Sequence, residues 1–154
     1  MHFMSVQRIA APRDFVFARA GEFRRLARAL ERRGAVVVPA AGPSGRPRYE
    51  VQYPFRDAMW PATLELQEMS APEWMEVTVE GKMVQAMARF DFDAPEPGIT
   101  QASMTVTIKP RNMQGRVLLG SMQVFRGRIQ GRLDRDFNGL ARAAERLWRK
   151  AGES

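Results

Sequence analysis

The sequence predicts an α+β fold in which a curved antiparallel sheet of seven strands wraps around one long C-terminal helix, with two short helices after the first strand. Three observations support this prediction. Apolar residues recur every three or four positions over 118–147, β-rich segments of alternating polarity fill 35–110, and short turn sequences separate those segments. A long helix with one apolar face needs a curved surface to cover it, and the strand region is the only segment large enough to do so.

The N-terminal part predicts one strand followed by two short helices. The strand is expected over 2–9 and ends before Pro12. Proline suits the first turn of a helix, so a helix is expected over about 12–19, and a second, arginine-rich helix over about 22–33. Gly34 then stands where a left-handed C-terminal cap is expected.

Six further strands are expected. A short β-rich run over 36–38 precedes a loop of Pro, Gly and Ala over 39–47. Beyond that loop, apolar side chains alternate with polar ones, as in half-buried antiparallel strands. The inward sets are Tyr49, Val51, Tyr53 and Phe55; Trp60, Ala62, Leu64 and Leu66; Met75, Val77 and Val79; Val84, Ala86, Ala88, Phe90 and Phe92; and Ala102, Met104, Val106 and Ile108. Turns are expected near 57, at 70–72, at 80–81 and at 95–98.

One apolar stripe predicts the C-terminal helix. Its members are Leu118, Met122, Phe125, Ile129, Leu133, Phe137, Leu140, Ala144 and Leu147. At about 3.6 residues per turn these side chains share one face, so a single helix of roughly 45 Å is expected. We expect residues 1–151 to form one domain and 152–154 to form a loose tail.

Composition excludes several classes of function. The chain has no cysteine, which excludes disulfides, thiolate nucleophiles and zinc–thiolate sites. His2 is the only histidine, and no clustered carboxylates are evident, so we expect no metal, no cofactor and no catalytic residue. No segment has the roughly 20 apolar residues of a membrane span or the apolar core of a signal peptide, which predicts a cytoplasmic protein without a membrane span.

The positive charge is concentrated at the two helical ends of the chain. Residues 1–34 hold eight basic and three acidic residues, residues 35–110 hold six and ten, and residues 111–154 hold ten and four, which gives nets of +5, −4 and +6. Nearly all of the positive charge is arginine. Arginine forks bind phosphates, so a nucleic-acid or other anionic partner is one interpretation, and a solvated helix face is the other.

Ile9, Ala11, Pro12, Val16 and Phe17 match, with small differences in spacing, the phrase I-x-A-P-x-x-V-F that ends the first strand in many helix-grip proteins. Together with the order of elements along the whole chain, this phrase resembles the helix-grip superfamily, which groups START, polyketide-cyclase and birch-pollen-allergen proteins as SRPBCC. The resemblance implies the fold and an apolar cavity between the sheet and the long helix. It implies no particular function, because the superfamily includes lipid carriers, hormone receptors, cyclases, quinone-binding proteins and chaperone activators and shares no catalytic residue.

The residues themselves leave the cavity open to two interpretations. Alanines on the central strands and ten methionines favour an adaptable apolar lining, whereas the same small residues would also let the helix approach closely. The residues expected to line the cavity are Tyr53, Phe55, Leu64, Val77, Ala88, Phe90, Met104, Val106, Met122, Arg126, Ile129 and Asp136.

Two of these residues are charged and lie within roughly 45° of the centre of the helical stripe. An inward Arg126 would anchor the carboxylate or phosphate of a ligand, and Asp136 would make a polar contact deeper along the helix. Alternatively, Arg126 extends outward along the edge of the stripe and Asp136 pairs with Arg132.

The function that these observations favour is the binding or transport of a hydrophobic small molecule, such as a lipid, a quinone or a polyketide-like compound. One alternative is a cyclase or dehydratase, for which only Asp136, Glu68 or the tyrosines offer a base. Another is an RNA-, ribosome- or protein-binding module that uses the arginine-rich helices. Gly120, Gly127 and Gly131 share the face opposite the stripe, which indicates either a homodimer contact or a weak helix held by packing.

Overall fold

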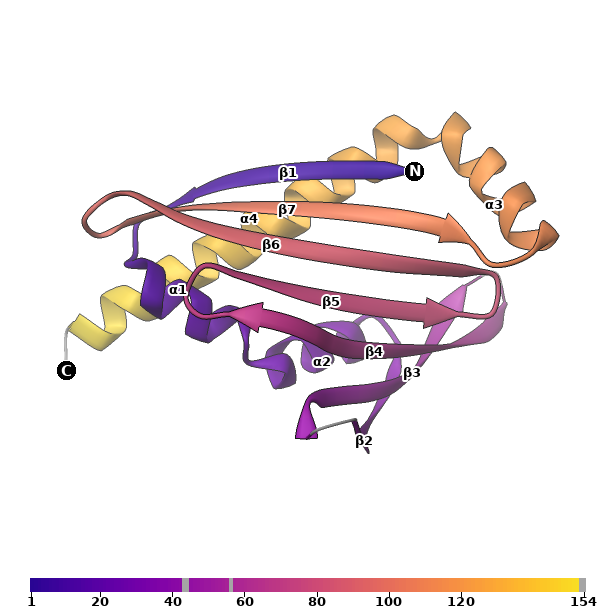
Figure 1. The fold of residues 1–154 in the computed structure, drawn as a ribbon, viewed down its shortest axis with the longest axis horizontal. Coiled ribbons are helices and arrows are strands. Elements are labelled where there is room, and N and C mark those ends of the chain that lie inside the picture. Colours follow the sequence, from indigo (N-terminus) through magenta and orange to yellow (C-terminus); the bar gives the residue numbers. More distant parts are fainter. Residues whose placement is uncertain (43–44, 56, 153–154) are drawn as a thin grey trace.

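The structure of the chain, a computed structural model, describes residues 1–42, 45–55 and 57–152, and for Phe55 only the backbone. The strands run antiparallel in one seven-stranded sheet, in the order β1-β7-β6-β5-β4-β3-β2 (Figure 1). The elements, in chain order, are β1 (His2–Ile9), α1 (Arg13–Ala20), α2 (Phe23–Arg32), β2 (Val36–Ala41), β3 (Pro47–Phe55), β4 (Ala58–Ser70), β5 (Trp74–Gly81), β6 (Val84–Glu96), β7 (Ile99–Pro110), α3 (Met113–Val124) and α4 (Arg126–Gly152). The predicted fold class is confirmed.

Turns form near most of the predicted positions, but the turn expected at 80–81 lies at 82–83, because Gly81 still belongs to β5. Gly34 has φ +92° after α2, Asp57 has φ +60° between β3 and β4, and Gly98 has φ +79° between β6 and β7. Only a residue that tolerates the left-handed region fits these positions, which explains two glycines and one aspartate there. The peptide bond between Ala71 and Pro72, in the β4–β5 turn, is cis.

The second strand is longer than its sequence predicts. Residues 39–41, expected in a loop, continue β2 and pair with Tyr49, Arg48 and Pro47 of β3. Pro39 is compatible with this because β2 is an edge strand, and an edge strand needs backbone donors on one side only. The part of the expected loop at 43–44 lies outside the described residues.

The prediction of a single C-terminal helix was wrong in one respect, since the chain forms two helices that meet at Phe125. Three hydrogen bonds attach the start of α3 to the β5–β6 turn: Arg111 N donates to Met83 O, the Arg111 side chain to Gly81 O, and the Asn112 amide to Lys82 O. A straight helix would carry these residues away from the sheet. Periodicity alone does not reveal such an anchor, and Phe125, expected inside the stripe, is 50% exposed at the break.

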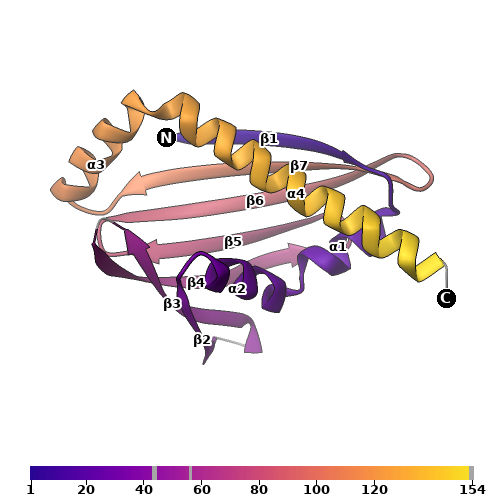
Figure 2. The ribbon, with the colours of Figure 1, turned by 180° about the vertical axis from the view of Figure 1, so that it is seen from behind.

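Helix α4 has 27 residues, or about 40 Å, and runs along the edge strand β1 (Figure 2). Side chains of α4 donate to the free carbonyl oxygens of that edge: Arg126 to His2 at 2.5 Å, Gln130 to Met4 at 2.8 Å and Arg142 to Arg8 at 2.5 Å. These bonds satisfy backbone acceptors that an edge strand otherwise leaves unpaired. Because α4 lies toward β1, it leaves the central strands less covered. α4 ends at Gly152, and residues 153–154 of the expected tail lie outside the described residues.

Candidate functional site

Solvent exposure divides the inner face of the sheet, the face that carries α2 and α4 in Figure 2, into two halves. The packed half lies near α1, where Ala102 is 1% exposed and Thr100 is fully buried, with its hydroxyl donating to Ala11 O at 2.7 Å. Phe92 meets Phe17 of α1 edge to face at 5.6 Å, and Phe137 of α4 is buried nearby against Phe90 at 6.2 Å. Side chains of helices and strands therefore fill this half.

The other half of the inner face is open to water. Its apolar side chains are only half-buried although they point toward the helices; they are Val79, Val84, Ala86, Ala88, Val106 and Ile108. The strand register places Val79, Ala86 and Ile108 side by side on β5, β6 and β7. The half-burial of Ala86 and Ala88 indicates that packing covers these short side chains only in part.

Two helices and one strand border this open half. Leu26 and Leu30 of α2 and Leu133 of α4 are half-buried against the core, as are Tyr49 and Tyr53 of β3. These three elements therefore present partly exposed apolar side chains to the same region. Partly exposed apolar side chains of this kind line many small-molecule sites.

The predicted lining residues divide in the same way. Leu64, Val77 and Met104 are buried, and Phe55 lies outside the described side chains. The half-buried members are Tyr53, Ala88, Phe90, Val106, Met122 and Ile129. Contact of these residues with a ligand stays a prediction.

Arg126 lies at the edge of the sheet. It is exposed, its guanidinium lies 4.8 Å from the centroid of the Phe3 ring, and it bonds the carbonyl of His2. Its position matches the alternative in which the side chain extends outward. Arg126 thereby connects α4 to β1.

Asp136 pairs with Arg33, at the end of α2, at 2.7 Å, and not with Arg132. The hydrogen bond and charge of Asp136 raise the pKa of Arg33 above its usual value, and Tyr53 adds to this effect, while burial opposes it. The ion pair thus joins α2 to α4 next to Tyr53. Two predicted residues, Tyr53 and Asp136, therefore meet at Arg33, which the sequence did not predict as a site residue. No local pattern signals a pair separated by 103 residues.

One buried polar group on the inner face has no partner. The hydroxyl of Ser5, on β1, is buried and makes no hydrogen bond to any residue that the structure describes. A buried hydroxyl without a partner is unfavourable. Ser5 was not among the predicted residues, although its place between the inward Phe3 and Ile9 in the alternating strand was a usable signal.

Two hollows lie at the edge of the inner face. The first, of about 330 Å³, is lined by Gly21, Glu22, Phe23, Arg24, Arg25, Arg28, Pro47 and Tyr49. The second, of about 290 Å³, is lined by Pro39, Ala40, Ala41, Gly42, Gly45, Arg46, Pro47, Arg48 and Tyr49. None of the eleven predicted lining residues whose side chains the structure describes borders either one. The first hollow depends on the approach of α2 to β3, and the second lies within the β2–β3 hairpin; periodicity predicts neither.

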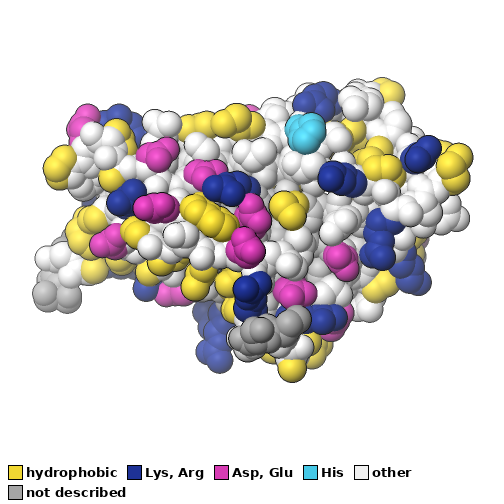
Figure 3. Space-filling view, viewed as in Figure 1, with side chains coloured by type: hydrophobic (Ala, Val, Ile, Leu, Met, Phe, Trp, Pro, Cys, Tyr) yellow, Lys and Arg dark blue, Asp and Glu magenta, His cyan; other side chains and the backbone are white. Residues whose placement is uncertain are grey.

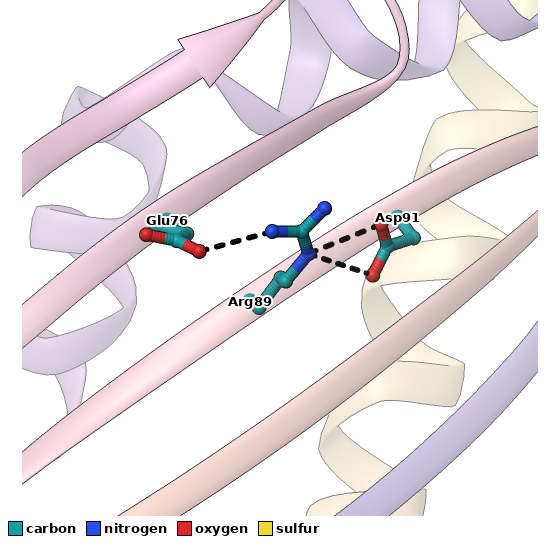
Figure 4. A network of polar contacts seen from close by, with 3 residues as sticks. All are labelled: Glu76, Arg89 and Asp91. Atoms are coloured by element: carbon teal, nitrogen blue, oxygen red, sulfur yellow. Dashed lines mark hydrogen bonds and ion pairs between the residues drawn. The ribbon is translucent and has the colours of Figure 1, made fainter.

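The outer face of the sheet carries mixed charges (Figure 3). At its centre, Arg89 of β6 bonds Glu76 of β5 at 3.0 Å and Asp91 at 3.2 Å, and lies 4.5 Å from the ring centroid of Trp74 (Figure 4). Burial lowers the pKa of Arg89, but its hydrogen bonds to Asp91 and Glu76 outweigh this and raise it overall. One guanidinium is paired with two carboxylates and stacked on an indole ring, which is typical of a structural cluster.

No described helix is long and apolar enough to cross a membrane. Within the described part of the chain, no group of three His, Cys, Asp or Glu side chains could hold a metal ion.

Comparison with solved structures identifies the fold. The Zhui aromatase/cyclase from Streptomyces sp. R1128 matches with a TM-score of 0.71 at 16% identity, over 99% of this chain and 98% of that chain. The protein TTHA0849 from Thermus thermophilus matches at 0.69 and 17%, over 94% and 97%. A START superfamily protein from Mycobacterium smegmatis matches at 0.55 and 11%, over 87% and 97%. No family model and no curated protein matches the chain in sequence.

These likenesses show the fold. The chain has the helix-grip fold of START and polyketide-cyclase proteins, as the phrase after its first strand implied. Identities of 11–17% carry no residue roles from those proteins to this one.

Proposed function

We propose that this protein binds and carries an apolar small molecule on the open half of the inner face. The observation that supports the proposal is the row of half-buried apolar side chains at Val79, Ala86 and Ile108. Apolar surface in contact with water is unfavourable by about 25 cal/mol per Å², and a ligand that covers it removes this cost. A lipid, a quinone or a polyketide-like compound has suitable apolar area.

Binding is better supported than catalysis. The Streptomyces neighbour is an aromatase/cyclase, so a polyketide-like substrate is a reasonable alternative at this level of likeness. Such chemistry needs a base that is free to take a proton. Asp136, the best-placed carboxylate, is held by Arg33 at 2.7 Å, and the unpartnered Ser5 hydroxyl has no base bonded to it. Asp136 and Ser5 therefore suit the positioning of a bound molecule better than proton transfer.

Extraction of the purified protein followed by mass spectrometry tests the proposal. We expect a co-purifying apolar compound, and stabilisation of the stripped protein when that compound is added back. An Ala86→Phe variant fills the open half, so it should lose most of the co-purifying compound. Met87→Phe is the matched control, because Met87 is the next residue on β6 and is exposed on the outer face.

The outcomes are distinct. Loss of the compound in Ala86→Phe but not in Met87→Phe supports a site on the inner face. Equal retention in both variants, or no compound recovered and no stabilisation by any member of a lipid and quinone set, would contradict it.

A further inference from the structure

The arginines of α2 form a surface that the proposed function does not use. The hollow of about 330 Å³ between α2 and the start of β3 is lined by Arg24, Arg25 and Arg28. Among the described residues of that lining, Glu22 is the only acidic one. The hollow therefore carries a net positive charge and is large enough for a charged head group.

The carboxylate of Glu22, the acidic residue of this hollow, is already paired with arginines. Glu22 bonds Arg19 at 2.8 Å and also pairs closely with Arg25. Arg24 and Arg28 are exposed, and their side chains make no ion pair or hydrogen bond with any residue that the structure describes. Two guanidinium groups thus keep their full charge beside the hollow, and guanidinium forks match carboxylate and phosphate geometry.

The adjoining hollow adds to the positive charge. It shares Pro47 and Tyr49 with the first and is lined by two more arginines, Arg46 and Arg48, and by no acidic residue. Glu50 holds one end of Arg48 at 3.1 Å, but the Nε–H of Arg48 is buried and has no acceptor among the described residues. An anion placed between these arginines would meet donors that the protein itself leaves unsatisfied.

The first hollow meets the apolar inner face at Tyr49. Phe23, in the same lining, is buried in the core, and Tyr49 packs half-buried against that core. The strand register places Tyr49 beside Leu64, then Val79, Ala86 and Ile108, in one row across β3 to β7. Three strand spacings, about 14 Å, separate Tyr49 from Ala86 on this row. Leu64 is buried, so protein side chains already cover the row between Tyr49 and Val79. A molecule with an anionic end at the arginines therefore places its apolar body against the half-buried Tyr49.

We infer that the hollow beside α2 binds the anionic head, a carboxylate or a phosphate, of an amphipathic ligand whose apolar part lies against Tyr49 at the border of the inner face. This inference rests on the proposed function, and it names the ligand class: a molecule with one negative end, such as a fatty acid or a monoalkyl phosphate. Arg24 and Arg28 bind the head directly.

Isothermal titration calorimetry with four probes tests the inference: decanoate, decyl phosphate, decanol and inorganic phosphate. The variant is the double substitution Arg24→Gln with Arg28→Gln. The control is Arg146→Gln with Arg149→Gln, which removes the same charge from two exposed arginines of α4 that border neither hollow. Circular dichroism checks that both variants fold.

We expect decanoate and decyl phosphate to bind the wild type at least about tenfold more tightly than decanol, and the α2 variant to lose that advantage. Decanol should bind the wild type and both variants equally, and the control variant should keep the preference for the anionic probes. Added salt should weaken the two anionic probes only.

Each contrary result has a separate meaning. Equal affinity for decanol and decanoate, or an anion preference that survives in the α2 variant, would overturn the anion site and leave the proposed function standing. An equal loss in the control variant would also overturn it, because the preference would then come from net charge. Binding of inorganic phosphate with neither decyl compound bound, or binding of no probe at all, would overturn the proposed function and, with it, the assignment of a ligand head to this hollow.

Discussion

Two alanines on the inner face allow a direct test of the open half. Ala102 of β7 lies in the packed half and is 1% exposed, whereas Ala86 of β6 lies in the open half and is half-buried. Substitution of either by leucine adds the same three carbon atoms. The two variants therefore differ only in whether the structure has room for them.

The expected effects have opposite signs. At Ala102 the added carbons meet a filled region, and overpacking should lower the free energy of unfolding by about 1–3 kcal/mol. At Ala86 each added carbon is partly removed from water. Since a fully buried CH₂ contributes about 0.8 kcal/mol, three half-buried ones should raise stability by up to about 1 kcal/mol.

Urea denaturation followed by circular dichroism measures both values. We expect a lower midpoint for Ala102→Leu and an unchanged or higher midpoint for Ala86→Leu, with similar slopes. If Ala86→Leu is destabilised as much as Ala102→Leu, the inner face is packed throughout and the reasoning from partial burial is wrong.

Three further predictions concern single contacts. Gly115→Ala should lower the free energy of unfolding by about 1–3 kcal/mol, because a Cβ there would lie 2.0 Å from a backbone carbonyl oxygen. Gly120→Ala, with nothing within 4 Å of its Cβ, should raise it by about 1 kcal/mol. Thermal unfolding compares the two variants, and equal effects would contradict the α3 anchor. A double-mutant cycle on Arg33 and Asp136, each 41% exposed, should give a coupling below about 1 kcal/mol, and a larger value would mean that the pair is more shielded from water than its exposure indicates. Ser5→Ala should leave the stability of the ligand-free protein unchanged or slightly higher, since it removes an unpartnered hydroxyl, and a clear loss by urea titration would show that this hydroxyl has a partner.

The strands and their faces could be predicted from the sequence because alternation is a local property. Val77, Ala88 and Val106 were assigned to one face separately, and the register places them side by side. Likewise Gly34 predicted the end of α2, because the left-handed conformation that often follows a helix favours glycine.

The break at Phe125 could not be predicted in the same way. The apolar stripe continues through it with helical spacing, whereas hydrogen bonds attach the start of α3 to the β5–β6 turn and α4 to β1. The bonds of α3 join segments about thirty residues apart, which a periodic pattern does not describe.

The sequence by itself determined which residues form strands and helices and which side of each is apolar, because local spacing of side chains carries that information. Only the tertiary structure decided which half of the apolar face stays uncovered, since this depends on α4 lying along β1 and bonding its free carbonyls. It also decided that Asp136 meets Arg33 and that the arginines of α2 border a hollow. Contacts between distant segments arise from the path of the chain in space, and no local pattern encodes them.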